Sequence, residues 1–425
     1  MLGSTTNAAQ SHLSSLHHVQ GSHLAHMFPT GKADQDTIRR HNASLAMNEL
    51  WRYAPLSRAE LAKRIGVNRS TISGIVARLL DAKLILETRF RTDRVGRPGL
   101  LLEVNTQGVG AIGVEIGLEY VHVLLTDLAG QPLWRRRILI GAGEEQETYV
   151  HIAEEMTRQA LTTAEEAELL VCGIGLILPG LVDAAQGALR YAPGLRLVDA
   201  QFRSRWAERF DLPVIVENNA NAGALAEFYF GVARDIADFI YIASEPGIGG
   251  GIMARGELLR GENGFAGEIG HMCIVPNGEA CGCGKRGCWE TLIGPKALIS
   301  AYHRRARDFN GGAKMDVNGI GLSDLAEAAS LSDVAAGAVL REAGRYLGIG
   351  IANLVNIFNP KIVILGGALG EIGDTLIPVA RETVKEESLF PMRDSLTILP
   401  SAQGTDDSVL GAVSLVLDSV LRAPV

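Results

Sequence analysis

One histidine and three cysteines are spaced in the sequence like the ligands of a metal ion. Cys281, Cys283 and Cys288 are two and five residues apart, and His271 precedes the first of them by ten. Three thiolates and one imidazole are typical of a closed, tetrahedral structural zinc site, which can order a loop with little regular structure of its own. Glycines between the cysteines allow the backbone to turn tightly around the ion. We therefore predict zinc as the cofactor and a zinc loop over residues 271–290.

A disulfide or unconnected free thiols are the alternatives for these cysteines. Five cysteines in 425 residues are too few for a secreted disulfide scaffold, and the clustering argues against unconnected thiols. Cys172 is expected in the core, and Cys273 is not expected to be a ligand. No apolar stretch approaches the roughly 18 residues of a membrane span. With no signal-peptide pattern either, the sequence indicates a cytoplasmic protein without membrane contact, and residues 1–35 are expected to be a disordered tail.

Charge is distributed unevenly along the chain. Residues 37–99 contain 13 Lys and Arg against 5 Asp and Glu, whereas the whole chain has a net charge of −8. A basic segment on an acidic body indicates that only this segment meets a polyanion such as DNA.

The basic segment has a helix-turn-helix pattern. Apolar residues at helical spacing predict a first helix over residues 38–53. Ser57 and Glu60 form a capping-box pattern at the start of a second helix, predicted over residues 58–65. Gly66 then supplies a sharp turn.

Asn68 is a suitable N-cap for a third helix, predicted over residues 69–81. In a helix-turn-helix the leading end of this helix contacts base edges in the major groove. The residues expected to do so are Arg69, Ser70, Thr71 and Ser73.

A turn-rich hairpin follows, over residues 87–104, with a basic tip. As the wing of a winged helix, it would place Arg94 and Arg97 on phosphates or in a minor groove. The alternative is a three-helix bundle with a solvated hairpin. Capping, turn and charge together favour a winged helix-turn-helix DNA-binding domain over residues 36–106.

The rest of the chain, residues 107–425, alternates strand and helix patterns, which indicates an α/β body whose halves meet in a cleft near residues 215–250. Strands are predicted over 111–117, 120–125, 133–140, 170–178, 214–217, 239–243, 251–253 and 361–365, and helices over 148–164, 220–230, 339–357, 375–386 and 408–421.

Two motifs resemble the signature of the ROK family (repressors, open reading frames, kinases). The first is Glu-x-Gly-His, ending at His271, and the second is Cys-x-Cys-Gly-x-x-Gly-Cys-x-Glu, from Cys281 to Glu290. Gly-Arg-Pro at residues 96–98 is similar to the repressor branch, which includes N-acetylglucosamine, xylose and glucose repressors. The resemblance extends from about Ile38 to Leu421. It implies a two-lobed, actin-like ATPase fold with a sugar in the interlobe cleft, usually in homodimers or homotetramers.

The resemblance also implies roles for individual residues. Glu268 and Glu290 match the family's acceptors of sugar hydroxyls, and His271 matches the zinc ligand beside the sugar. Asn218 matches the asparagine that precedes the catalytic aspartate, and Pro179-Gly180 matches a loop on the sugar side. Taken alone, the two glutamates could instead support the zinc loop, and the two roles are compatible.

The kinase motifs of the family are altered here. Its kinases use the aspartate of Glu-Asn-Asp as general base, but position 219 is asparagine, and an amide has no accessible basic pair near neutral pH. Leu118 and Glu119 replace small residues in the first phosphate loop, and Glu245-Pro246 alters the second. Gly366-Gly367 resembles the adenosine-side turn. We therefore expect no catalytic residues.

These observations predict a transcriptional regulator of carbohydrate metabolism. Its partners would be a double-stranded DNA operator and a sugar or sugar derivative, without phosphoryl transfer. The alternatives are an ATP-dependent sugar kinase with a DNA-binding head, against which Asn219 argues, and a regulator controlled by a protein partner.

Overall fold

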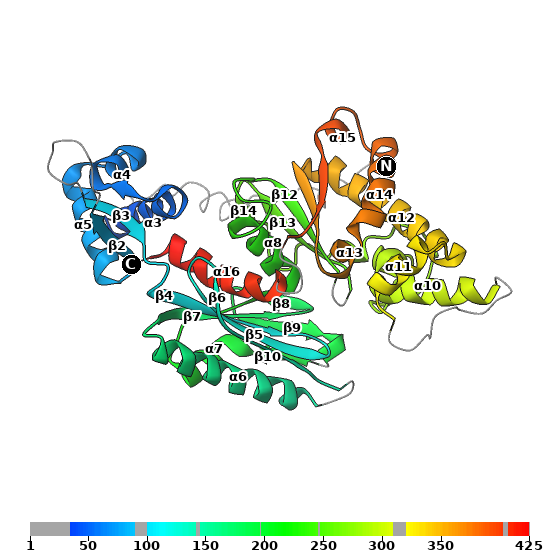
Figure 1. Cartoon of the computed structure of the whole chain (residues 1–425), viewed down its shortest axis with the longest axis horizontal. Helices are drawn as coiled ribbons and strands as arrows, with labels where there is room; N and C mark the ends of the chain where they lie inside the picture. The colour runs from blue at the N-terminus through cyan, green and yellow to red at the C-terminus, as the bar shows by residue number, and fades with distance from the viewer. Residues whose placement is uncertain are drawn as a thin grey trace, which may run out of the picture. The chain divides into compact units, whose positions relative to one another are not determined.

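A computed structural model describes residues 35–89, 100–141, 145–195, 197–244, 247–308, 320–402 and 407–424 (Figure 1). The chain divides into two compact units. The first comprises Met1–Val104 together with Leu421–Val425, and the second comprises Asn105–Val420.

Within the described residues, the first unit contains three helices and a small antiparallel sheet. The helices are α3 (Gln35–Tyr53), α4 (Arg58–Ile65) and α5 (Arg69–Asp81). The strands β1 (Leu56–Ser57), β2 (Ile85–Arg89) and β3 (Leu100–Val104) are ordered β1-β3-β2. Apolar side chains from all three helices and from the sheet form the core, among them Leu50, Leu61, Ile72 and Leu102.

Local sequence signals fix the ends of α4 and α5. Ser57 accepts a hydrogen bond from the Glu60 backbone N–H at 3.2 Å, and the Glu60 carboxylate accepts one from the Ser57 backbone N–H at 2.9 Å. Gly66, with φ of 74°, ends α4 in the left-handed conformation that glycine adopts readily. Asn68 caps α5 by accepting from the Thr71 backbone N–H at 2.8 Å. The predicted bounds of both helices are confirmed.

The second unit begins with a mixed five-stranded sheet of order β11-β7-β4-β5-β6. Its strands are β4 (Val109–Ile116), β5 (Tyr120–Asp127), β6 (Pro132–Leu139), β7 (Leu170–Leu178) and β11 (Val214–Asn218). Helices α6 (Gln146–Glu166) and α7 (Phe202–Phe210) pack on one face, and α16 (Asp407–Arg422) packs on the other (Figure 1). Glycines permit this second contact, because a Cβ at Gly175 would lie 1.8 Å from the Ala412 carbonyl oxygen.

A second five-stranded sheet has the order β14-β13-β12-β15-β16. Its strands are β12 (Phe239–Ala243), β13 (Gly249–Ala254), β14 (Glu257–Leu258), β15 (Ile362–Leu365) and β16 (Thr397–Pro400). The helices of this part of the chain are α8 (Asn219–Tyr229), α9 (Glu290–Ile293), α10 (Pro295–Asp308), α11 (Leu322–Ser330), α12 (Val334–Phe358), α13 (Gly367–Glu371), α14 (Gly373–Glu387) and α15 (Met392–Ser395).

Three features complete the second unit. A small sheet of order β10-β9-β8 joins β8 (Leu181–Asp183), β9 (Ala188–Ala192) and β10 (Leu197–Gln201), and it is followed directly by α7. The described part of this unit also has two 3-10 turns, η1 (Pro193–Leu195) and η2 (Ile269–His271). The longest helix, α12, has 25 residues and buries one face in the core of the second sheet. No helix within the described residues is long and apolar enough to cross a membrane.

Candidate metal centre and adjoining pocket

The four predicted metal ligands lie together. Their donor atoms, from His271, Cys281, Cys283 and Cys288, are all within 4.8 Å of one another, so the group could hold a metal ion. The Cys283 and Cys288 sulfurs are 3.7 Å apart, and the Cys281 sulfur is 3.6 Å from His271 Nδ1. In a tetrahedral site with bonds of about 2.3 Å to sulfur and about 2.0 Å to nitrogen, these separations would be about 3.8 and about 3.5 Å. The donor set therefore fits a tetrahedral ion.

The loop that carries these ligands is fixed to the core of the second sheet by Trp289. This side chain is fully buried, and its Nε1 donates a hydrogen bond to the Tyr346 carbonyl oxygen at 2.8 Å. A Cβ at Gly350 would lie 2.0 Å from the indole ring, so only glycine leaves room for it. Because Trp289 lies between Cys288 and Glu290, its burial positions both of them.

The two remaining cysteines lie outside this group. Cys273 is exposed, and its thiol points to the Arg286 carbonyl oxygen at 3.7 Å. Cys172 packs against the small apolar cluster beneath α16. Burial raises the pKa of the Cys172 thiol to about 11, which leaves it protonated at neutral pH and a poor ligand.

Two carboxylates flank the histidine. Glu290 Oε1 is 3.4 Å from His271 Nδ1, and Glu268 Oε2 is 3.8 Å from His271 Nε2. Desolvation raises the pKa of Glu268, and the nearby Glu290 raises it further, although His271 acts in the opposite direction. Glu290 also accepts a hydrogen bond from the Cys281 thiol at 2.7 Å. Three of the four predicted sugar-binding residues, Glu268, His271 and Glu290, therefore lie together.

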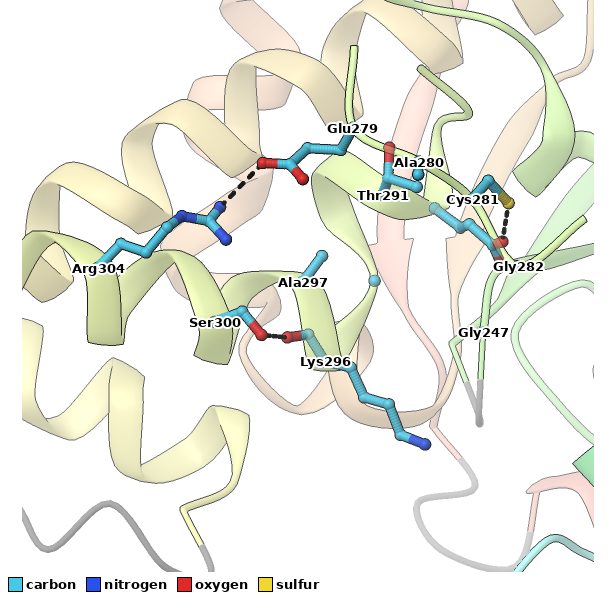
Figure 2. A pocket seen from close by; sticks show the side chains of 12 residues that line it. Gly247, Glu279, Ala280, Cys281, Gly282, Thr291, Lys296, Ala297, Ser300 and Arg304 are labelled. Atoms are coloured by element: carbon cyan, nitrogen blue, oxygen red, sulfur yellow. Dashed lines mark hydrogen bonds and ion pairs between the residues drawn. The ribbon is translucent and has the colours of Figure 1, made fainter. Parts of the chain in front are cut away.

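A pocket of about 380 Å³ adjoins this group (Figure 2). Glu290 and the candidate metal ligand Cys281 contribute to one wall, and residues of α10 from Lys296 to Arg304 contribute another. An ion pair between Arg304 and Glu279 at 3.5 Å lies farther along α10. The Gly247 backbone borders the pocket close to Glu290, since a Cβ at Gly247 would lie 2.9 Å from Glu290 Oε2. The lining residues are Gly247, Glu279, Ala280, Cys281, Gly282, Glu290, Thr291, Gly294, Lys296, Ala297, Ser300 and Arg304.

The fourth predicted sugar-binding residue, Asn218, is at the end of β11, where it caps α8. Its Oδ1 accepts hydrogen bonds from the backbone N–H groups of Ala220 at 2.8 Å and Asn221 at 3.4 Å. Its Nδ2 donates to the Gly180 carbonyl oxygen at 2.9 Å. Because Nδ2 carries two hydrogens, one N–H remains available for a ligand.

The turn at the position of the first phosphate loop is filled by protein side chains. Glu115 is buried, and its carboxylate accepts hydrogen bonds from Tyr120 at 2.8 Å and from Ser408 at 2.7 Å. Leu118 packs against the 3-10 turn η1, since a Cβ at Gly194 would lie 2.5 Å from it. The carboxylate thus connects β4, β5 and α16, and the leucine occupies space beside the turn.

The structure describes the second glycine-rich stretch only in part and the third one fully. In the second, the glycines from Gly249 onward form β13, whereas Glu245 and Pro246 lie outside the described residues. In the third, Ser244 donates a hydrogen bond to the Gly366 carbonyl oxygen at 2.6 Å and accepts one from the Leu369 backbone N–H at 2.8 Å. Ser244 therefore stabilises this turn from within the protein.

The predicted base-contacting residues are in the first turns of α5. Arg69, Ser70 and Ser73 are exposed, and Thr71 is half-buried. Ser70 and Ser73 each donate a hydrogen bond within the helix start, to Asn68 Oδ1 at 2.7 Å and to the Arg69 carbonyl oxygen at 2.8 Å. Arg94 and Arg97, predicted for the wing, lie outside the described residues.

Sequence reasoning did not select two further exposed positions of α5, Gly74 and Arg78. A Cβ at Gly74 would meet nothing within 4 Å. The signal that could have identified both is helical periodicity, because Gly74 and Arg78 follow Ser70 by four and eight residues and lie on the same face.

Comparisons with known proteins identify the family of this chain. A model of the ROK family matches residues 111–419, so the chain belongs to the ROK family. The xylose repressor of Bacillus subtilis is 32% identical over 389 residues, covering 92% of this chain and 98% of the repressor. The DNA-binding transcriptional dual regulator NagC of Escherichia coli is 28% identical over 399 residues, covering 93% and 98%. A crystal structure of a ROK family transcriptional regulator, a homologue of the E. coli MLC protein, superimposes with a TM-score of 0.82 at 29% identity and covers 91% of this chain and 97% of that one.

Proposed function

We propose that this chain is a sugar-responsive transcriptional repressor of carbohydrate metabolism that acts in the cytoplasm. The single observation that supports this most is that groups able to accept sugar hydroxyls are retained while the catalytic base is absent. Glu268 and Glu290 flank His271, where they can accept sugar hydroxyls, while position 219, the place of the kinase general base, is an amide. Carboxylates and amides satisfy hydroxyl groups well and discriminate against a sugar that lacks one of them.

The proposed sugar site comprises Asn218, Glu268, His271 and Glu290. One Asn218 N–H is free to donate to a hydroxyl, and the two carboxylates accept. The pocket of about 380 Å³ that borders Glu290 offers further room for the ligand (Figure 2).

Zinc is the proposed cofactor, held by His271, Cys281, Cys283 and Cys288. The three sulfur donors favour a soft or borderline ion, and the separations of the donor atoms fit tetrahedral coordination. When bound, zinc neutralises the thiolates and fixes the loop. His271 would then be held by one ring nitrogen on the metal side, with the other ring nitrogen on the side of Glu268.

We propose that the chain does not transfer phosphoryl groups. Asn219 cannot remove a proton from a sugar hydroxyl. The buried carboxylate of Glu115 is bound by Tyr120 and Ser408, and Leu118 brings a side chain to a turn where phosphate requires close approach of the backbone. With Glu245-Pro246 in the second phosphate loop, three elements that phosphoryl transfer needs are altered together.

DNA binding is assigned to residues 36–106 as a winged helix-turn-helix, with α5 as the recognition helix and Arg69, Ser70, Thr71 and Ser73 as base-contacting residues. Arg94 and Arg97 of the wing are assigned to the phosphate backbone or the minor groove. Arg58 and Arg64 form ion pairs within the unit, with Glu87 and Glu49. Exposed cations of α5, such as Arg69, are therefore better candidates for DNA contacts.

The regulatory mechanism we propose links the two functions in a homodimer or homotetramer. Sugar binding closes the cleft or reorients the zinc loop and thereby changes the spacing of two DNA-binding heads, which must match the helical repeat of the operator. A coupling free energy of about 1–3 kcal/mol is typical of such linkage.

Substitution of Glu268 tests this proposal. Glu268→Ala should abolish the effect of the sugar on operator binding, while operator affinity without sugar remains as in the wild type, because Glu268 lies in the second unit and far along the chain from α5. Fluorescence anisotropy of labelled operator DNA measures both quantities. An unchanged sugar response in Glu268→Ala would contradict the proposed site.

A further inference from the structure

An ion pair joins the two parts of the proposed sugar site. Arg260, the second residue after β14, donates from Nε to Glu217 Oε2 at 2.8 Å. The Glu217 side chain is only 1% exposed and that of Arg260 is 39% exposed. Because Glu217 belongs to β11 and Arg260 follows β14, the pair connects the first five-stranded sheet to the second.

The Glu217 carboxylate also orients the residues that follow it. Its Oε1 accepts a hydrogen bond from the Asn218 backbone N–H at 2.9 Å and another from Asn221 Nδ2 at 3.1 Å. Both carboxylate oxygens are thus in use, one toward the start of α8 and one toward Arg260. The position of this buried side chain therefore determines where Asn218 lies.

On the side of the second five-stranded sheet, Arg260 begins the loop that leads to Glu268. Its carbonyl oxygen accepts a hydrogen bond from the Ala266 backbone N–H at 2.9 Å, which closes the loop. Gly267 then accepts from the Gly250 backbone N–H at 2.8 Å. With φ of 99° at Gly267, a Cβ there would lie 2.0 Å from the Gly250 carbonyl oxygen, so the backbone beside Glu268 packs tightly on β13.

We propose that Arg260 is a positioning residue for the effector, an inference that rests on the proposed sugar site. A buried carboxylate is costly without a cation, so Glu217 keeps Arg260 in place across the two sheets. This fixes the separation of Asn218 and Glu268, the hydroxyl-binding groups that the two sheets contribute. The sugar then binds to groups that are already in position, which lowers the conformational-entropy cost of binding.

Arg260→Met removes the cation and leaves the buried carboxylate unpaired. We expect the affinity for the effector to fall about tenfold, the equivalent of one charged hydrogen bond of about 1.4 kcal/mol. Operator affinity without effector should not change. The probe is whichever of D-xylose, D-glucose and N-acetyl-D-glucosamine shifts the operator affinity of the wild-type full chain, and its binding is measured by calorimetry. If Arg260→Met does not fold, Arg260→Gln is the milder variant, with the same expected direction.

The double variant Glu217→Gln with Arg260→Met distinguishes positioning from the cost of an unpaired buried charge. A neutral amide at position 217 needs no cation, but the link between the two sheets is still missing, so effector affinity should stay as low as in Arg260→Met. Arg234→Met is the matched control. Its side chain is exposed and forms no hydrogen bond or ion pair with the described residues, so effector affinity should stay at the wild-type value.

Three results would overturn this inference while leaving the proposed function intact: wild-type effector affinity in Arg260→Met, an equal loss of operator binding without effector, or recovery of effector affinity in the double variant. A wild-type protein whose operator affinity responds to none of the three sugars would instead overturn the proposed function, and with it the inference that depends on it.

Discussion

Three thiols and one imidazole have their donor atoms within 4.8 Å of one another, so ionising all three thiols in this space requires a cation. The thiols must lose their protons, and the resulting thiolates repel one another unless an ion lies between them. Burial and the hydrogen bond to Glu290 both raise the pKa of Cys281, so it stays protonated at neutral pH unless a metal replaces the proton. At the residue scale, the conformation of this loop should therefore depend on its metal.

Cys288→Ala should remove the metal and destabilise the loop. Cys288 is fully buried and belongs to the cluster. We expect zinc to fall from one ion per chain to none and the free energy of unfolding to fall by more than about 2 kcal/mol. Atomic emission and thermal unfolding measure the two effects. Cys273→Ala is the control, since this exposed cysteine lies outside the cluster, and equal zinc contents in the two variants would contradict the assignment.

Asn219→Asp restores a carboxylate at the position of the kinase base. We nevertheless expect no sugar phosphate, because Glu115 is bound by Tyr120 and Ser408 and because Leu118 still fills the turn at the first phosphate loop. A coupled assay for ADP with D-glucose and ATP checks this. Turnover in the variant would show that position 219 alone separates this chain from a kinase.

The clustering of His271, Cys281, Cys283 and Cys288 could be predicted because their spacing is a local property of the sequence. The role of Asn218 could be predicted only in part. Its hydrogen bonds to the start of α8 and to Gly180 depend on which strands are neighbours, and β11 lies beside β7 only in the folded sheet. The Glu217–Arg260 ion pair depends on the same long-range packing, since its members are 43 residues apart.

At the scale of single elements, α4 and α5 have the clearest sequence signals, because the capping box, the glycine turn and the asparagine cap act within a few residues. The body helices α6, α12, α14 and α16 also agree with their patterns to within a few residues. The small sheet of β8, β9 and β10 and the helices α7, α10 and α11 were not predicted. Except for α10, which has 14 residues, these segments are short, and tertiary packing decides their conformation.

Gly74 offers a test of α5 as the recognition helix. Gly74→Ala should raise the free energy of unfolding by about 0.5–1 kcal/mol, because a glycine inside a helix is destabilising and the new Cβ meets nothing within 4 Å. Operator affinity should fall roughly fivefold or more, as a disturbed base contact costs about 1–3 kcal/mol. Gly337→Ala in α12 is the control, where the Cβ would meet only the end of Arg341 at 3.5 Å. Stabilisation of both variants without loss of operator affinity would argue against α5 in the groove.

At the scale of the whole molecule, one chain combines regulation of transcription with a response to a sugar. The first unit has the helices expected to meet DNA, and the second has the His-Cys cluster that could hold a metal ion and the groups proposed to bind sugar hydroxyls. The alternation of strands and helices predicted an α/β body, but not the order of its strands. Strand order depends on long-range pairing, which periodicity along a sequence does not specify.

The central claim, that a sugar changes operator affinity without being phosphorylated, is tested most directly by one titration. The purified full chain is bound to DNA from its own promoter region, and D-xylose, D-glucose and N-acetyl-D-glucosamine are added in turn with ATP present, while sugar phosphate is assayed in the same samples. We predict that one sugar changes operator affinity by about 5–150-fold and that no sugar phosphate forms. Formation of a sugar phosphate, or operator binding that no sugar alters, would contradict the account.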